Sequence, residues 1–135
     1  MKSRIGKNTT KNVLIVDDDQ ATRTNLSLLF EEEGFRVILA EDGLAGIIKA
    51  CEALPDVIVC DIMLPKLNGY SLLAALQLTE STGLIPVIIL SAKQDEFDIA
   101  QSKLMGAVAY ITKPYHGSDL IRSVKCHLTT ADKSV

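Results

Sequence analysis

The sequence predicts one α/β domain with a doubly wound sheet of five parallel strands and helices on both faces. Its 135 residues are enough for one compact domain. Apolar residues make up 47% and charged residues 23%, which excludes collagen-like and disordered chains. Short apolar runs alternate with amphipathic helical stretches, and parallel strands need right-handed helical crossovers between them.

Five apolar runs are predicted to be strands. They are continuous and rich in β-branched residues, which is typical of strands that are covered on both faces. Proline precedes the third and fourth runs at positions 55 and 86. The runs are Val13–Val16, Phe35–Ala40, Val57–Cys60, Val87–Leu90 and Ala107–Ile111.

One-sided apolar stripes predict the helices between these strands, and we expect each stripe to lie on the sheet. Gly34 stands where the first helix should have its C-cap, and Asp42 can cap the second helix. The stripes are Leu26, Leu29 and Phe30; then Leu44, Ile47, Ile48 and Cys51; and finally Leu120, Ile121, Val124 and Leu128.

The charge distribution and the cysteine spacing argue against nucleic-acid binding by the folded part and against a cysteine metal site. Residues 1–11 contain four basic residues and no acid, so the remainder carries a net charge of about −7. We therefore expect no nucleic-acid binding by the folded part, residues 12–128. Residues 1–11 are predicted to be a mobile basic tail and residues 129–135 a C-terminal tail. The three cysteines lack metal-ligand spacing and are predicted to be reduced, mostly buried thiols.

No long apolar stretch and no apolar leader is visible in the sequence. A membrane span requires about 20 apolar residues, and none of the runs approaches that length. We therefore expect a soluble, cytoplasmic protein without a membrane partner.

Acidic residues follow two of the predicted strands. Asp17, Asp18 and Asp19 come after the first strand and Asp61 after the third. Because ligands in open parallel sheets bind beyond the carboxyl ends of the strands, these carboxylates should converge there. Like charges in one crevice need protons or a cation, and an all-oxygen ligand set suits Mg²⁺ or Mn²⁺.

Two further side chains give this edge the chemistry of phosphoryl transfer. Ser91 ends the fourth strand and Lys113 follows the fifth, supplying a hydroxyl group and a positive charge. The chain has no glycine-rich phosphate loop, and no His or Cys is placed at a strand end as a nucleophile, so a carboxylate is the candidate. Asp61 is favoured because Asp17 and Asp18 are free to hold the metal.

Over residues 12–128 the chain resembles the receiver domains of two-component response regulators. The similarity includes the acidic segment VLIVDDD, the segment DIMLPKLNG that begins at Asp61, the segment LSA around Ser91, and a Y-x-x-K-P signature from Tyr110 to Pro114. The separations of 30 residues from Asp61 to Ser91 and 22 from Ser91 to Lys113 also fit that family. The resemblance implies the flavodoxin-like strand order 2-1-3-4-5 with five helices.

The resemblance also implies a phosphorylation switch. Asp61 would accept a phosphoryl group from a sensor histidine kinase or a histidine phosphotransfer protein, and Lys113 would stabilise the transferring oxygens. The peptide bond from Lys113 to Pro114 would be cis. Ser91 would then turn toward the phosphoryl group, and Tyr110 would rotate into the vacated space. Mg²⁺ would be bound by Asp17, Asp18, Asp61 and the Met63 carbonyl group.

The surface that reports the switch would contain the fourth helix, the fifth strand and the fifth helix, near residues 95–128. The first helix, near residues 21–28, would dock the phosphodonor, and the surface near 95–128 would bind a downstream output protein or domain. On this interpretation the chain is a phosphoacceptor signalling domain rather than a conventional enzyme, with Mg²⁺-dependent self-phosphorylation and autodephosphorylation. It acts as a stand-alone regulator or as part of a longer kinase or transcription factor.

Several of these residues also have ordinary structural interpretations. The aspartate triplet by itself is compatible with a solvated turn, Lys113 with a surface lysine, and Ser91 with a helix cap. Tyr110 is equally compatible with an unremarkable strand aromatic. Relative to the family, Ser91 replaces the commoner threonine, and the last helix lacks the usual cap, so Ser118 is predicted to cap it and to start it late.

Three other functions compete with this interpretation. A flavodoxin has the same architecture but needs a Ser/Thr/Gly-rich phosphate loop where this chain has carboxylates. A haloacid dehalogenase-type phosphohydrolase needs a second aspartate two residues after its nucleophile, where this chain has Met63. A pseudo-receiver that acts as an interaction module usually lacks pocket residues that are present here.

Overall fold

The computed structural model describes residues 10–133, and it describes side chains up to residue 128. Five strands form a single parallel sheet in the order β2-β1-β3-β4-β5, as predicted. The strands are β1 (Asn12–Val16), β2 (Arg36–Ala40), β3 (Val57–Cys60), β4 (Val87–Ser91) and β5 (Ala109–Thr112).

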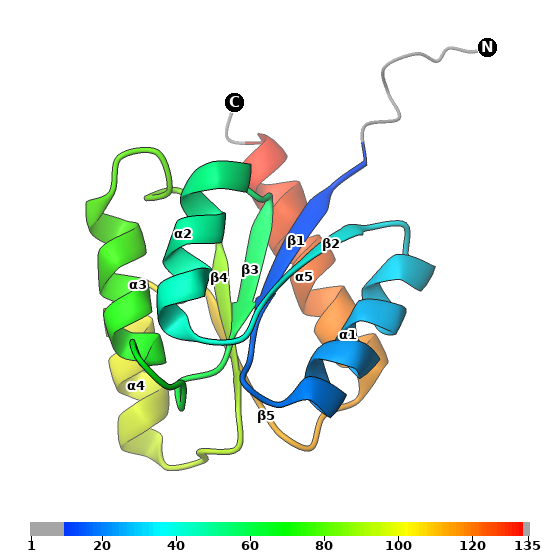
Figure 1. The fold of residues 1–135 in the computed structure, drawn as a ribbon. Coiled ribbons are helices and arrows are strands. Elements are labelled where there is room, and N and C mark those ends of the chain that lie inside the picture. Colours follow the sequence, from blue (N-terminus) through cyan, green and yellow to red (C-terminus); the bar gives the residue numbers. More distant parts are fainter. Residues whose placement is uncertain (1–9, 134–135) are drawn as a thin grey trace, which may run out of the picture.

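Helices cover both faces of the sheet (Figure 1). Helices α2, α3 and α4 lie on one face, and α1 and α5 lie on the other. None of the described helices is long and apolar enough to cross a membrane. The helices are α1 (Gln20–Glu32), α2 (Gly43–Ala53), α3 (Gly69–Leu78), α4 (Glu96–Leu104) and α5 (Gly117–Lys133).

An apolar core lies on each face of the sheet. Alternate residues of β1 supply both cores: Leu14 and Val16 face α2 and α3, whereas Val13 and Ile15 face α1 and α5. The three central strands are buried throughout except at Asn12, which is half-buried. The prediction of complete burial is wrong for the edge strands β2 and β5, which are mostly half-buried because each has a neighbour on one side only.

Capping contacts mark the ends of the helices. Asp42 accepts a hydrogen bond from the Ala45 N–H at 2.7 Å and caps α2, as predicted. Gly34 follows the C-cap of α1 and has a positive φ, as predicted for the end of that helix. The prediction for the last helix is wrong: α5 already begins at Gly117, so Ser118 lies inside it. The backbone carbonyl of His116 accepts from the Asp119 and Leu120 N–H groups instead.

Of the apolar stripe predicted for α2, Ile47 is partly buried and packs against the core, but the other three residues do not lie on the sheet. Leu44 and Ile48 are about half exposed and Cys51 is exposed, whereas the buried residues of this helix are Gly43, Gly46 and Ala50. A Cβ atom on Gly46 would lie 3.1 Å from the Val16 side chain. Small residues therefore face the sheet because the helix backbone approaches it closely, a requirement that hydrophobic periodicity does not register.

The cysteines and the chain ends also differ from expectation. Cys60 is buried, but Cys51 and Cys126 are exposed, so the prediction that most of the cysteines are buried is wrong. Helix α5 continues to Lys133, so most of the segment 129–135 that was predicted as a tail is helical. Residues 1–9 of the predicted N-terminal tail lie outside the described residues.

Replacing Gly43 with alanine should destabilise the fold. An added Cβ atom would lie 1.6 Å from the backbone oxygen of Leu67, so α2 or the loop before α3 must shift. We expect the free energy of unfolding to fall by about 2–3 kcal/mol in urea titrations. Gly83→Ala is the control, because its Cβ would stay 3.3 Å from the nearest atom and should cost less than about 1 kcal/mol. Equal stability of the two variants would contradict the close packing of α2.

Candidate functional site

The register of the sheet brings the predicted acidic residues to one edge. Val16 on β1 pairs with Cys60 on β3, so the residues that follow, Asp17 and Asp61, leave the sheet side by side. The Asp61 N–H donates to the Val16 carbonyl group at 3.1 Å. Both carboxylates are nearly buried, with exposures of 3% for Asp17 and 8% for Asp61. The edge is the carboxyl end of the strands, where parallel sheets bind ligands.

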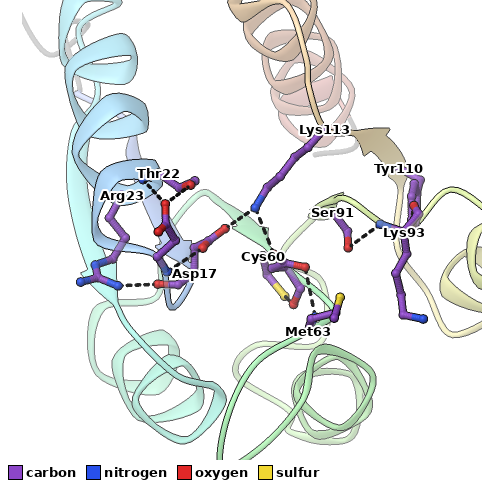
Figure 2. Close-up of polar contacts among 11 residues, drawn as sticks. Asp17, Thr22, Arg23, Cys60, Met63, Ser91, Lys93, Tyr110 and Lys113 are labelled. Atoms are coloured by element: carbon purple, nitrogen blue, oxygen red, sulfur yellow. Dashed lines mark hydrogen bonds and ion pairs between the residues drawn. The ribbon is translucent and has the colours of Figure 1, made fainter.

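Lys113 joins the two carboxylates (Figure 2). Its Nζ lies 2.8 Å from Asp17 Oδ2 and 3.0 Å from Asp61 Oδ2. The backbone holds Lys113 in place, because its N–H donates to the Ser91 carbonyl group at 2.9 Å. The peptide bond from Lys113 to Pro114 is cis. One ammonium group therefore bridges the tips of β1 and β3 from the end of β5.

The electrostatics of Lys113 favour its charged form. Burial lowers the pKa of Lys113, but hydrogen bonds and charge attraction from Asp17 and Asp61 outweigh that effect and raise the pKa above its usual value. The side chain is 22% exposed. Two carboxylates facing one ammonium leave this buried group of three with a net negative charge, a condition that attracts a further cation.

Backbone N–H groups orient each carboxylate. Asp17 Oδ1 accepts from the Asp19 N–H at 3.0 Å, and Asp61 Oδ1 accepts from the Met63 N–H at 3.0 Å. Arg23 donates to the backbone oxygen of Asp17 at 2.7 Å and ties α1 to the tip of β1. These contacts fix which oxygens face Lys113 and keep the two carboxylates directed into the same space.

The three consecutive aspartates have three different environments. Asp17 faces Lys113, whereas Asp18 is exposed and its side chain has no hydrogen bond or ion pair with any described residue. Asp19 caps α1 by accepting from the Thr22 N–H at 2.9 Å and the Thr22 hydroxyl group at 2.7 Å. These bonds lower the pKa of Asp19. The Asp-x-x-Thr spacing was the sequence signal for this cap, and the prediction did not use it.

Ser91 and Tyr110 lie beside this site and share a neighbour. Ser91 is fully buried, and its Oγ accepts a 3.3 Å hydrogen bond from the Lys93 N–H. The Tyr110 hydroxyl group donates to the Lys93 carbonyl group at 2.8 Å. Burial raises the pKa of the Tyr110 hydroxyl, which stays neutral at ordinary pH. Ser91 is not a helix cap, because Asp95 caps α4.

Cys60 does not contribute to the site. It packs in the core between the sheet and helices α2 and α3, and its thiol donates to the backbone oxygen of Asp61. Burial, together with the charges of Asp61 and Asp17, raises the pKa of this thiol far above its usual range. An uncharged buried thiol is neither a nucleophile nor a metal ligand here.

The donor set fits a small hard cation. Asp17 and Asp61 present carboxylate oxygens to one point, and the exposed Asp18 adjoins Asp17 in the chain. No cluster of three or more His, Cys, Asp or Glu residues is already arranged as a metal site within residues 10–128. The Lys113 ammonium occupies the point that both buried carboxylates face, and oxygen ligands of this kind suit Mg²⁺ or Mn²⁺.

Comparison with known proteins agrees with this geometry. The family model for the response regulator receiver domain matches residues 13–125. The chain is 34% identical to protein PilG of Pseudomonas aeruginosa over 116 residues, which are 86% of each protein. It spans about half the length of the transcriptional regulators among the curated relatives that it matches.

Solved structures give the same result. A CheY-like receiver domain protein from Methanospirillum hungatei superposes with a TM-score of 0.88 and 28% identity, covering 94% of this chain and 100% of that one. The receiver domain of sensor histidine kinase PA1611 from P. aeruginosa has a TM-score of 0.83 and 26% identity over 90% and 99% of the two chains. That structure has a magnesium ion coordinated in its active-site cleft.

These matches do not favour a flavodoxin or a haloacid dehalogenase. The family is a group of signalling domains that accept a phosphoryl group on an aspartate. Carboxylates at the tips of β1 and β3, a bridging lysine after β5, and a family match over most of the sequence all point to one assignment. The chain belongs to the response regulator receiver domain family of two-component signalling systems.

Proposed function

We propose that Asp61 is the phosphoacceptor of this receiver domain. The observation that supports this most directly is the Lys113 ammonium group, which lies within 3.0 Å of Asp61 Oδ2 and also contacts Asp17. In the transfer, a carboxylate oxygen of Asp61 forms a bond to phosphorus while the phosphorus–nitrogen bond of a phosphohistidine breaks. The electron pair of that bond stays on the leaving imidazole nitrogen, and the product is an acyl phosphate.

The surroundings of the two carboxylates distinguish their roles. Asp17 is the more enclosed, with its backbone oxygen bound by Arg23 and its side chain bound by the Asp19 N–H. Met63, two residues after Asp61, is 57% exposed, so the approach to Asp61 is open on that side. Asp17 is therefore suited to hold a cation, and Asp61 is suited to react.

Mg²⁺, or Mn²⁺, is the proposed cofactor. Asp17, Asp18, Asp61 and the Met63 carbonyl group would hold it, and when bound it supplies positive charge to the transferring oxygens. Lys113 supplies a second positive charge from the segment after β5. Its ammonium group is already bound to both carboxylates, so it needs little rearrangement to contact a phosphoryl oxygen.

Ser91 and Tyr110 are the proposed switch residues. Both are bound to Lys93 in the unmodified protein, Ser91 through its Oγ and Tyr110 through its hydroxyl group. When Ser91 turns toward a phosphoryl group on Asp61, its hydrogen bond to Lys93 is lost and Tyr110 can rotate inward. The surface of α4, β5 and α5 then changes and signals the modification to a downstream protein or domain.

The proposed partners follow from this chemistry. The phosphodonor is a sensor histidine kinase or a histidine phosphotransfer protein that docks near α1, beside the tip of β1. Output passes through protein contact, because the acidic folded part lacks the basic surface that nucleic acid requires. A cytoplasmic location suits both partners, whether the chain acts by itself or within a longer protein.

Phosphorylation should depend on Asp61. We expect acetyl phosphate with Mg²⁺ to add one phosphoryl group to the intact protein, as measured by mass spectrometry. Asp61→Asn should remove the labelling, since an amide is not a nucleophile. The matched control Asp119→Asn changes an exposed aspartate on α5 and should label like the original protein. Equal labelling of Asp61→Asn would contradict the assignment, and absence of labelling in the original protein would favour a pseudo-receiver.

Removing the positive charge of Lys113 should make the free energy of unfolding depend more strongly on Mg²⁺. Lys113→Met leaves two nearly buried carboxylates facing each other, so in chelator we expect a loss of about 2 kcal/mol in unfolding free energy. Mg²⁺ should raise the urea midpoint of this variant more than that of the original protein, because the cation replaces the lost charge. The control Lys125→Met removes an exposed ion pair to Glu33. Its unfolding free energy in chelator and the response of its urea midpoint to Mg²⁺ should match those of the original protein. A midpoint insensitive to Mg²⁺ in every protein would argue against the metal site.

A further inference from the structure

Helix α4 has no fully buried apolar side chain. Its buried residues are Asp98 and Ser102, whereas Phe97 and Leu104 are 73% and 83% exposed. By contrast, the buried residues of α3 include Leu72, Leu73 and Leu76. Since burial of apolar surface is the main source of helix anchoring, the polar contacts of α4 have unusual weight in fixing its position.

Asp98 is the centre of these contacts. Its Oδ1 accepts a hydrogen bond from the hydroxyl group of Tyr70 at the start of α3, and its Oδ2 lies 3.4 Å from Lys93 Nζ. The Tyr70 bond is the largest cause of a lowered pKa at Asp98, so the carboxylate is charged at ordinary pH. Burial and the neighbouring Asp98 raise the pKa of Tyr70 to about 12, so the hydroxyl group keeps its proton and donates it.

Lys93 connects this cluster to both proposed switch residues. Its N–H donates to Ser91 Oγ, its carbonyl group accepts from the Tyr110 hydroxyl, and its Nζ contacts Asp98. The backbone of Lys93 is therefore bound to the two proposed switch residues, and its side chain is bound to α4. If the backbone of Lys93 moves, either its contact with Asp98 lengthens or the lysine side chain or α4 rearranges with it.

We propose that Tyr70, Asp98 and Lys93 form a latch between α3, α4 and the β4–α4 segment that favours the unmodified conformation. This inference rests on the proposed function, because it concerns regulation of the phosphorylation site at Asp61. Turning Ser91 and Tyr110 removes two hydrogen bonds from Lys93, so modification works against the latch. Tyr70 and Asp98 are positioning residues, since neither touches the reacting atoms.

Linkage gives the direction of the effect. A contact that is stronger in the unmodified conformation stabilises that conformation. It therefore lowers the affinity of the protein for any ligand that binds the modified conformation more tightly. Removing the Tyr70 hydroxyl should therefore increase affinity for beryllofluoride, a phosphoryl mimic, in the presence of Mg²⁺. One hydrogen bond of ordinary strength corresponds to an increase of about three- to tenfold.

The test compares Tyr70→Phe with Tyr115→Phe. Both substitutions remove one hydroxyl group from a partly buried tyrosine, but the Tyr115 hydroxyl has no hydrogen bond to any residue within 10–128. We expect Tyr70→Phe to bind beryllofluoride about three- to tenfold more tightly and to label faster with acetyl phosphate. Tyr115→Phe should match the original protein in both measurements.

A second readout needs neither metal nor phosphodonor. In the metal-free Tyr70→Phe protein, the Lys93 and Ser91 amide resonances should shift part of the way toward their positions in the beryllofluoride-bound original protein. Asp98→Asn, which keeps an acceptor but loses the charge that attracts Lys93, should shift them in the same direction. A role in stability alone would lower the urea midpoints without moving these resonances along that line.

The outcomes separate the latch from the proposed function. If the original protein labels on Asp61 while Tyr70→Phe shows unchanged or weaker affinity, or unshifted amide resonances, the latch is wrong and the proposed function stands. If the original protein neither labels nor binds beryllofluoride, or if Asp61→Asn binds it equally well, the proposed function itself fails. Tighter binding by Tyr115→Phe as well would show that the effect is not specific to Asp98 and would also overturn the latch.

Discussion

The contact of one ammonium group with two nearly buried carboxylates constrains the rest of this molecule. Asp17 and Asp61 would repel each other at the tips of adjacent strands if Lys113 did not lie between them. Taking three charged groups out of water is costly, so the arrangement persists only because the backbone holds all three. Each residue immediately follows a strand whose register is set by the sheet: Val16 pairs with Cys60, and Ser91 pairs with Thr112.

The sequence was informative wherever position along a strand decides the outcome. The convergence of Asp17 and Asp61 and the place of Lys113 follow from parallel strands that end at one edge, whereas the strand order was implied by the resemblance to receiver domains. Side-chain periodicity failed on α2, because close approach to the sheet selects Gly46 and Ala50 over Leu44 and Ile48. A pattern of apolar residues records hydrophobicity, but it contains no information about the distance between a helix and its sheet.

The polar contacts that sequence reasoning missed are those between distant segments. Nothing near Tyr70 in the sequence indicates that its hydroxyl group meets Asp98, 28 residues later, because the contact depends on how α3 and α4 pack side by side. The cap of α1 is different, since Asp19 and Thr22 are local and their spacing was visible. Local chemistry can be predicted from the sequence, whereas long-range polar pairs need the fold first.

Helix α4 differs from α1, α3 and α5 in what anchors it, and this difference suits a switch. On the other face of the sheet, α1 and α5 pack through Leu26, Phe30, Leu120 and Val124, all almost fully buried, so that side resists rearrangement. Helix α4 has no fully buried apolar side chain, and its buried Asp98 binds Tyr70 and Lys93 instead. Hydrogen bonds and ion pairs can exchange partners over short distances without opening cavities, whereas apolar packing cannot. A phosphoryl group at Asp61 would therefore move the part of the structure where motion has the lowest cost, next to Ser91 and Tyr110.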